Sequence, residues 1–224
     1  MSNILVIGAH PDDETLGVGG TLLKHKLKGD SIVWLNATKM DISNPILSSI
    51  IKEREKEIEK VIDHYGIEEF IQLDYLTTQL TSESKLKMIP ELSKVFTRIK
   101  PEIIYVVNRS DAHSDHRYLF EAVYSATKSF RQPSIKKILM YECLSETEFG
   151  FPISEHLFLP NYFVDITPYL DQKIEIMKVY ASEISEPPFP RSEQNIRALA
   201  TLRGSTAGVL AAEAFQVLKI MDKE

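Results

Sequence analysis

Cysteine is nearly absent: Cys143 is the only one among 224 residues. This excludes a disulfide within the chain and a zinc site built from several thiolates, so a metal would have to be held by histidine and carboxylate. Cys143 follows a predicted strand and has no basic neighbour to lower the pKa of its thiol, which argues against a nucleophilic role.

Long apolar runs and an excess of positive charge are also missing. No stretch approaches the roughly 18 apolar residues that span a bilayer, and the first ten residues lack the basic start of a signal peptide. We therefore expect a cytoplasmic enzyme without membrane insertion. The formal net charge of -6 argues against nucleic acid as a partner and leaves a small molecule as the expected substrate. Whether copies of the chain form a homo-oligomer stays open.

What is present is an alternation of short apolar runs with amphipathic stretches. This pattern predicts an α/β fold with a mostly parallel sheet and helices on both faces. The expected strands are 3–9, 31–36, 70–73, 102–107 and 137–141, and the expected helices are 15–28, 48–65, 83–99 and 117–130.

The C-terminal third is less regular. It suggests a strand at 162–166, a helix at 168–182 and a proline-rich connection at 186–191, while 197–218 mixes helix signals with two glycines. Because the chain has no repeat and no long linker, we predict one domain, residues 1–224. The role of 186–224 in substrate choice cannot be assigned from the pattern.

Two clusters of acids and histidines stand directly after predicted strands. The first is HPDDE at 10–14 and the second is DAHSDH at 111–116. In open parallel sheets, sites form beyond the carboxyl ends of the strands, so the two clusters can converge although about a hundred residues separate them. Pro11 also favours an extended backbone at His10, which keeps that residue at the tip of the strand.

These residue types suit a catalytic zinc, which commonly takes three ligands from histidine and carboxylate and leaves one position open. His10 and Asp13 can close on one ion from a tight loop, and His116 can supply the third ligand from the other strand end. Two imidazoles and one carboxylate leave the site with a net positive charge, which acidifies a bound water.

Three further residues of the clusters have chemistry to offer. Asp12 is a separate carboxylate beside a ligand and can accept a proton from the attacking water. His113, as imidazolium, can stabilise an oxyanion or protonate the leaving amine. Asp115 can orient a histidine.

Simpler interpretations exist for each cluster alone. Asp12, Asp13 and Thr15 are residue types that cap helices, and histidines in a loop are usually solvated. The joint occurrence, in a chain with six histidines, favours the metal site. The other three histidines, His25, His64 and His156, lack partner spacing and are expected in the core or on the surface.

The sequence AHPDDE at 9–14, together with His113-x-Asp115-His116, resembles the PIG-L/LmbE family of zinc-dependent de-N-acetylases. The resemblance implies a Rossmann-like layered fold and one zinc per chain on His10, Asp13 and His116. It implies Asp12 as general base and His113 as the electrostatic or acid partner. The implied reaction removes the acetyl group from an N-acetylglucosamine-type sugar or sugar conjugate.

The resemblance extends towards the C-terminus through Arg203-Gly204 and the segment 212–215. Two departures concern loops: Ser114 stands where the family usually carries proline, and the segment 36–40 lacks an expected glycine turn. Neither removes a ligand. The second puts the identity of the substrate in question. The segment 142–148 follows a strand and is expected near the same edge of the sheet.

Arg54 falls on the apolar stripe of the predicted helix 48–65. One explanation is that its stem is buried and its head reaches solvent. The family has an arginine in the corresponding helix that binds substrate, so the resemblance implies that Arg54 is a substrate anchor.

Two rival functions remain. A phosphoesterase usually needs two metals about 3.5–4 Å apart, and Asp12, Asp111 and Asp115 would be the remaining carboxylates for a second ion. A non-catalytic sugar-binding protein on the same scaffold would not need Asp12 or His113.

Overall fold

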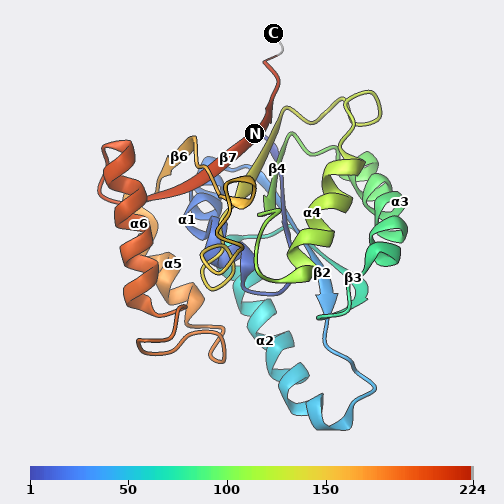
Figure 1. Ribbon diagram of the computed structural model, residues 1–224, viewed down its shortest axis with the longest axis horizontal. Coiled ribbons are helices and arrows are strands. Elements are labelled where there is room, and N and C mark those ends of the chain that lie inside the picture. The colour runs from blue at the N-terminus through green and yellow to red at the C-terminus, as the bar shows by residue number, and fades with distance from the viewer. Residues whose placement is uncertain (223–224) are drawn as a thin grey trace.

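The computed structural model describes residues 1–222 and has one seven-stranded sheet as its centre (Figure 1). The strands follow the order β3-β2-β1-β4-β5-β7-β6 across the sheet. All neighbours are parallel except β7, which runs antiparallel to both β5 and β6. Their bounds are β1 Asn3–Gly8, β2 Ser31–Lys39, β3 Glu69–Leu76, β4 Ile103–Val107, β5 Lys137–Tyr141, β6 Tyr162–Asp165 and β7 Ala212–Ile220.

The helices cover both faces of the sheet. Helix α1 packs against α2 and α5, whereas α3 packs against α4 on the other face, as right-handed crossovers on either side of β1 require. The predicted mostly parallel, helix-covered α/β architecture is confirmed. The helices are α1 Asp13–Lys28, α2 Ser48–Tyr65, α3 Ser82–Ile99, α4 Ser114–Ala126, α5 Leu170–Met177 and α6 Glu193–Ala207.

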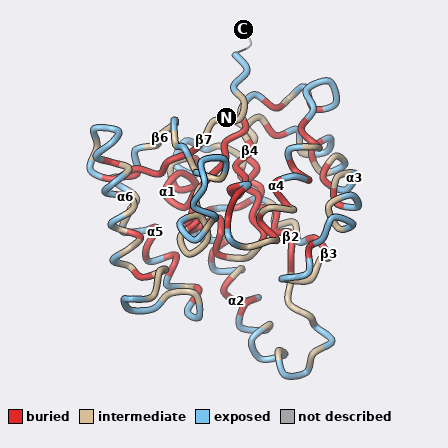
Figure 2. The backbone as a smooth tube through the Cα atoms, viewed as in Figure 1, coloured by how far each residue is buried: buried red, intermediate tan, exposed pale blue. Residues whose placement is uncertain are grey.

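The core follows the central strands (Figure 2). Residues 4–7 of β1 and 104–107 of β4 are all buried, because a parallel strand with helices on both faces has no solvent side and needs apolar residues throughout. Across residues 1–222, no helix combines the length and the apolar character needed to cross a membrane.

The segment 197–218, which mixed helix signals with two glycines, divides into two elements in the structure, because α6 ends at Ala207 and β7 follows. The residues 212–220 form strand β7, not a continuation of helix, because they pair with β5 on one side and β6 on the other. Within this strand the buried Glu213 accepts hydrogen bonds from the amides of Gly20 and Thr21 and forms an ion pair of 2.7 Å with Lys173. These partners lie far away in sequence, so local pattern could not reveal them.

The arrangement of β1 and β4 positions the site. These two strands are neighbours. From β1 the chain adds β2 and β3 on one side, and then reverses direction to add β4 and β5 on the other side. Sites in open α/β sheets form in the crevice at such a reversal. Both acid-and-histidine clusters begin there, one after each strand.

Candidate metal centre and active site

The structure brings the three predicted metal ligands together. His10 follows β1, Asp13 begins α1, and His116 lies in the first turn of α4, which starts at Ser114, three residues earlier than expected. One potential ligand atom from each residue lies within 4.8 Å of the other two. This spacing lets one ion bridge all three side chains.

Asp13 is held by the backbone that precedes it. Its Oδ2 accepts hydrogen bonds from the amides of Ala9 at 2.8 Å and His10 at 2.9 Å, which leaves Oδ1 facing His116 Nε2 at 3.2 Å. Burial alone would raise the pKa of this carboxyl, but His116 and His10 outweigh it and lower the pKa below its usual range. Asp13 is therefore an anionic, oriented carboxylate that could hold a metal ion.

His116 is fully buried and tied down at one nitrogen only. Its Nδ1 lies 2.8 Å from Asp111 Oδ2, while the other oxygen of Asp111 accepts hydrogen bonds from Asn108 and Thr147. Within residues 1–222, Nε2 makes no hydrogen bond although it is buried. A buried nitrogen that lacks a hydrogen bond and faces a carboxylate fits a metal donor, and a carboxylate on the far nitrogen is the usual partner of such a ligand.

The role of Asp111 was not predicted. From the sequence, Asp111 was a candidate only for a second ion, although its place in the same cluster, five residues before His116, was the available signal.

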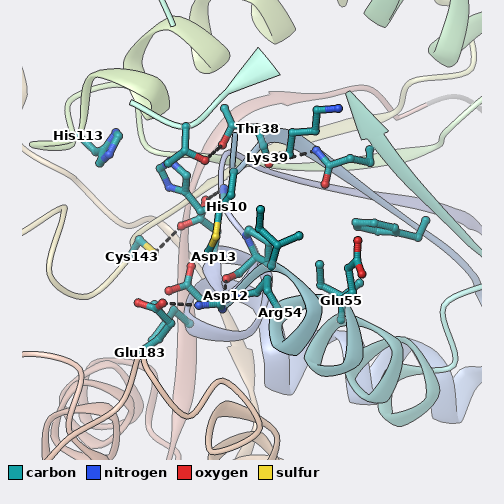
Figure 3. Close-up of a pocket in the computed structure, with 18 of the residues that line it drawn as sticks. His10, Asp12, Asp13, Thr38, Lys39, Arg54, Glu55, His113, Cys143 and Glu183 are labelled. Carbon is teal, nitrogen blue, oxygen red and sulfur yellow. Dashed lines mark hydrogen bonds and ion pairs between the residues drawn. The ribbon is translucent and has the colours of Figure 1, made fainter. Parts of the chain in front are cut away.

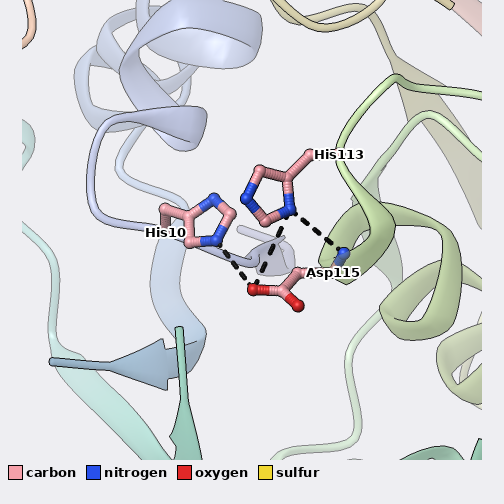
Figure 4. Close-up of side chains that lie close together, drawn as sticks. All are labelled: His10, His113 and Asp115. Atoms are coloured by element: carbon pink, nitrogen blue, oxygen red, sulfur yellow. Dashed lines mark hydrogen bonds and ion pairs between the residues drawn. The ribbon is translucent and has the colours of Figure 1, made fainter. Parts of the chain in front are cut away.

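Asp115 connects the two clusters (Figure 4). Its Oδ2 lies 3.1 Å from His10 Nε2, and the same carboxylate accepts hydrogen bonds from the amides of Thr78 and Leu80. His10, His113 and Asp115 also form a group with ligand atoms within 4.8 Å. Because Asp115 is fully buried and already bonded to His10 and two amides, this geometry favours an orienting role over a ligand role.

His113 is set as a neutral hydrogen-bond donor. Its Nδ1 accepts the amide N–H of Asp115 at 3.1 Å, so the proton of the neutral ring resides on Nε2. Burial and the neighbouring His10 lower the pKa of His113 to about 4. At neutral pH the structure thus favours imidazole, where the sequence analysis had expected imidazolium.

Asp12 does not act as a helix cap, although it occupies the N-cap position of α1. Its φ is 140°, a costly backbone conformation for a residue other than glycine, and among the described residues its carboxylate makes no capping hydrogen bond. The carboxylate lines the cavity and lies 3.8 Å from Arg191 Nη1. Burial and the adjacent Asp13 raise its pKa well above the usual value.

A cavity of about 580 Å³ opens over these side chains (Figure 3). This volume falls within the range of about 300–1,000 Å³ that is typical of small-molecule sites. As expected for the segment 142–148, Cys143, Leu144 and Glu146 contribute to its lining. The Cys143 thiol is buried and its pKa is raised, which agrees with the absence of a nucleophilic role.

Arg54 lines the same cavity and does not reach out to solvent. Its guanidinium donates to the Pro11 carbonyl at 3.2 Å, to Ser182 at 3.0 Å and to Glu183. Arg191 binds the other oxygen of Glu183 at 2.9 Å. Glu183 thus joins two arginines beside Asp12. Neither Glu183 nor Arg191 was predicted, because they come from an irregular segment without a motif.

The remaining histidines lie elsewhere. His25 is a core residue whose ring nitrogens lie 2.7 Å from Asp30 and 2.9 Å from Tyr105. His64 is exposed near the end of α2, and His156 is half-buried at the end of a short 3-10 helix, Ser154–His156.

Comparison with known proteins gives consistent relatives. The chain is 25% identical to a diacetylchitobiose deacetylase of Thermococcus kodakarensis over 95% of this chain and 82% of that protein. The solved structure of an N,N'-diacetylchitobiose deacetylase from Pyrococcus horikoshii superposes with a TM-score of 0.77 at 24% identity, covering 96% of this chain and 83% of that one.

The same fold also serves another reaction. The 4-carboxy-2-hydroxymuconate hydratase of Pseudomonas putida superposes with a TM-score of 0.73 at 16% identity, covering 100% of this chain and 99% of that one. Fold similarity at this level therefore does not identify the reaction. The sequence itself matches a family profile over residues 5–127, and the chain belongs to that family, PIG-L, described as GlcNAc-PI de-N-acetylase.

Proposed function

We propose that this protein is a zinc-dependent de-N-acetylase that removes the acetyl group from an N-acetylglucosamine-type sugar or sugar conjugate. One observation carries the proposal: a His10–Asp13–His116 group that fits one ion, with Asp13 and His116 buried, stands beside a second carboxylate, Asp12, which the strained backbone turns into the cavity. Neither the stability of the fold nor the binding of a sugar requires that second carboxylate.

The chemistry divides between the metal and the chain. When bound by His10, Asp13 and His116, zinc would polarise the amide carbonyl and lower the pKa of a water. Asp12 accepts a proton from the attacking water as its oxygen bonds to the carbonyl carbon. The carbon–nitrogen bond then breaks, and the proton passes from Asp12 to the nitrogen, so that acetate and an amine leave.

Other residues hold the reacting groups in place. The Nε2–H of His113 donates a hydrogen bond to the carbonyl oxygen as negative charge develops there. The Asp115 carboxylate fixes His10 at 3.1 Å, and the backbone amide of Asp115 donates to Nδ1 of His113 and orients that ring. Arg54 lies on the cavity wall and anchors the sugar from the α2 side.

The test is acetate release from a panel of N-acetylglucosamine conjugates by zinc-loaded protein. We expect Asp12→Asn to lower turnover by about 10²- to 10⁴-fold, because general base catalysis is lost, while zinc content stays unchanged. Asp171→Asn is the matched control, since Asp171 is exposed on α5. Substantial activity in Asp12→Asn would disprove the base assignment.

Metal analysis separates the phosphoesterase alternative. Two ions per chain, together with phosphate release, would favour it. No acetate release from any conjugate with zinc supplied would favour a sugar-binding protein.

A further inference from the structure

The cavity has two unlike sides. One is the metal end, formed by the predicted ligands with Asp12 and His113. In Figure 3, His113 and Cys143 lie on this side and Glu55 lies across from them. The far side includes an apolar wall contributed by the loop after β2, α2 and β3. The wall consists of Met40, Ile42, Ile51, Ile58, Ile62 and Phe70.

Helix α2 turns two different stripes inward. Its buried residues, Arg54, Glu57, Val61 and Tyr65, form one stripe. Ile51, Ile58 and Ile62 follow at steps of seven and four, so they form a neighbouring stripe that lines the cavity and stays half-buried. These three positions of the second stripe are apolar, and the exposed Glu55 lies between Ile51 and Ile58 on the same side of the helix.

Two polar side chains beside the wall, Gln72 and Lys39, are already engaged, whereas Glu55 and Glu59 of α2 also line the cavity and are exposed. The Gln72 amide nitrogen donates to the carbonyls of Asn36 and Thr38 at 3.2 and 3.1 Å, and its oxygen accepts from the Asn36 side chain. Lys39 forms an ion pair of 2.7 Å with Asp74. A sugar hydroxyl packed against the isoleucine side chains would lose water without gaining a partner from them, which is unfavourable. An alkyl or aryl group would gain by leaving water.

Exposed apolar residues also stand between the wall residues Ile42 and Ile51 in the sequence. Ile42 is 71% exposed. Ile46, in the connection between β2 and α2, and Ile50, in the first turn of α2, are 84% and 49% exposed. A compact polar substrate gains nothing from such residues, whereas an extended apolar substituent can pack against them.

We propose that the substrate carries an alkyl or aryl substituent that lies along the apolar wall while its amide carbonyl lies at the metal end. This inference rests on the proposed function, because it places the scissile amide. The substituent is either an acyl chain longer than acetyl or an apolar aglycone, and both present the same chemistry to the wall.

The test measures binding and not turnover. Zinc-loaded Asp12→Asn protein is titrated by calorimetry with two series of ligands. One series is alkyl β-N-acetylglucosaminides from methyl to octyl, and the other is methyl glucosaminides with N-acyl chains from acetyl to octanoyl. We expect Kd to fall about two- to fourfold per added methylene in one series until the wall is filled. The responding series identifies the substituent, and Kd values that are flat in both overturn the proposal.

A variant of the wall makes the test specific. Ile51→Asp places a charge on the wall and should abolish the gain with chain length, with a normal circular dichroism spectrum confirming folding. Leu86→Asp, at an apolar residue of α3 that is 65% exposed, is the matched control and should keep the gain. A gain that persists in Ile51→Asp overturns the proposal.

Two other results have distinct meanings. If affinity is flat and Ile51→Asp dissociates an oligomer, the wall is an interface between copies and the proposal fails. If the wild-type protein releases no acetate, the proposed function fails, while the chain-length dependence of Kd still decides the binding of apolar groups.

Discussion

The two sides of the cavity differ in what holds their side chains. At the metal end, Asp13, His116 and Asp115 are buried and fixed by hydrogen bonds to backbone amides or to another carboxylate. On the apolar wall, residues such as Ile42 and Ile51 are held by packing alone and are partly exposed. Polar groups that must meet reacting atoms need preset positions, whereas an apolar surface tolerates adjustment. The difference teaches that substrate preference can change here without disturbing the metal end.

The largest effect should come from removing a ligand at the metal end. On the proposed function, His116→Ala deletes one of the three metal donors, so we expect the purified protein to lose the metal. Turnover should fall by on the order of 10³-fold or more, because several kcal/mol of transition-state stabilisation are lost. Metal analysis after dialysis and acetate release are the measurements.

His64→Ala is the control for that loss, because His64 is exposed on α2. Full zinc content in His116→Ala would place the ion elsewhere, with the His10–His113–Asp115 group as the next candidate.

A smaller effect is expected when the donor His113 is removed. His113→Ala should lower kcat by about 10²- to 10³-fold, as for loss of one oxyanion donor, and His113→Gln should recover part of it because it keeps an N–H. Zinc content should not change.

The pH dependence of that effect tests the charge of His113. Its pKa is lowered from 6.5 to about 4, so a proton binds only as the pH falls towards 4. The ratio of wild-type to His113→Ala activity should therefore stay constant between about pH 5 and about pH 8. A ratio that grows as the pH falls would show instead that the imidazolium is the active form.

The smallest of these effects should come from a residue that touches a ligand and not the metal. Asp111→Asn keeps its size but loses the charge that orients His116, so zinc affinity should fall by about 10- to 100-fold. Competition with a chelator measures this. Asp63→Asn, at an exposed position of α2, is the matched control. An unchanged affinity would mean that packing alone orients His116, and the contrast between the two sides of the cavity would weaken.

The central strands and the position of the site could be predicted, because they depend on local sequence pattern. The runs of buried apolar residues in β1 and β4 appear directly in the sequence. These two parallel strands are neighbours at the point where the order of strands in the sheet reverses, so their carboxyl ends lie together. The placement of His10, Asp13 and His116 at one point followed from these two facts.

The features that could not be predicted from the sequence depend on partners that are distant in the chain. Strand β7 exists because β5 and β6 accept it on either side, and its buried Glu213 is matched by Lys173 from another element. Glu183 reaches Arg54 across 129 positions. Such contacts leave no periodic signal, so an irregular segment looks uninformative until the chain is folded.

The sequence by itself determined the chemistry available at the site. It supplied no thiolate cage and placed histidines and carboxylates at the ends of two apolar strands, because strand burial and residue type are local properties. Only the tertiary structure decided how these groups are used. It turned Asp12 into the cavity, paired His116 with Asp111, made His113 neutral and set an apolar wall opposite the metal end. Orientation, desolvation and cavity shape arise from contacts between distant segments, which only the folded chain creates.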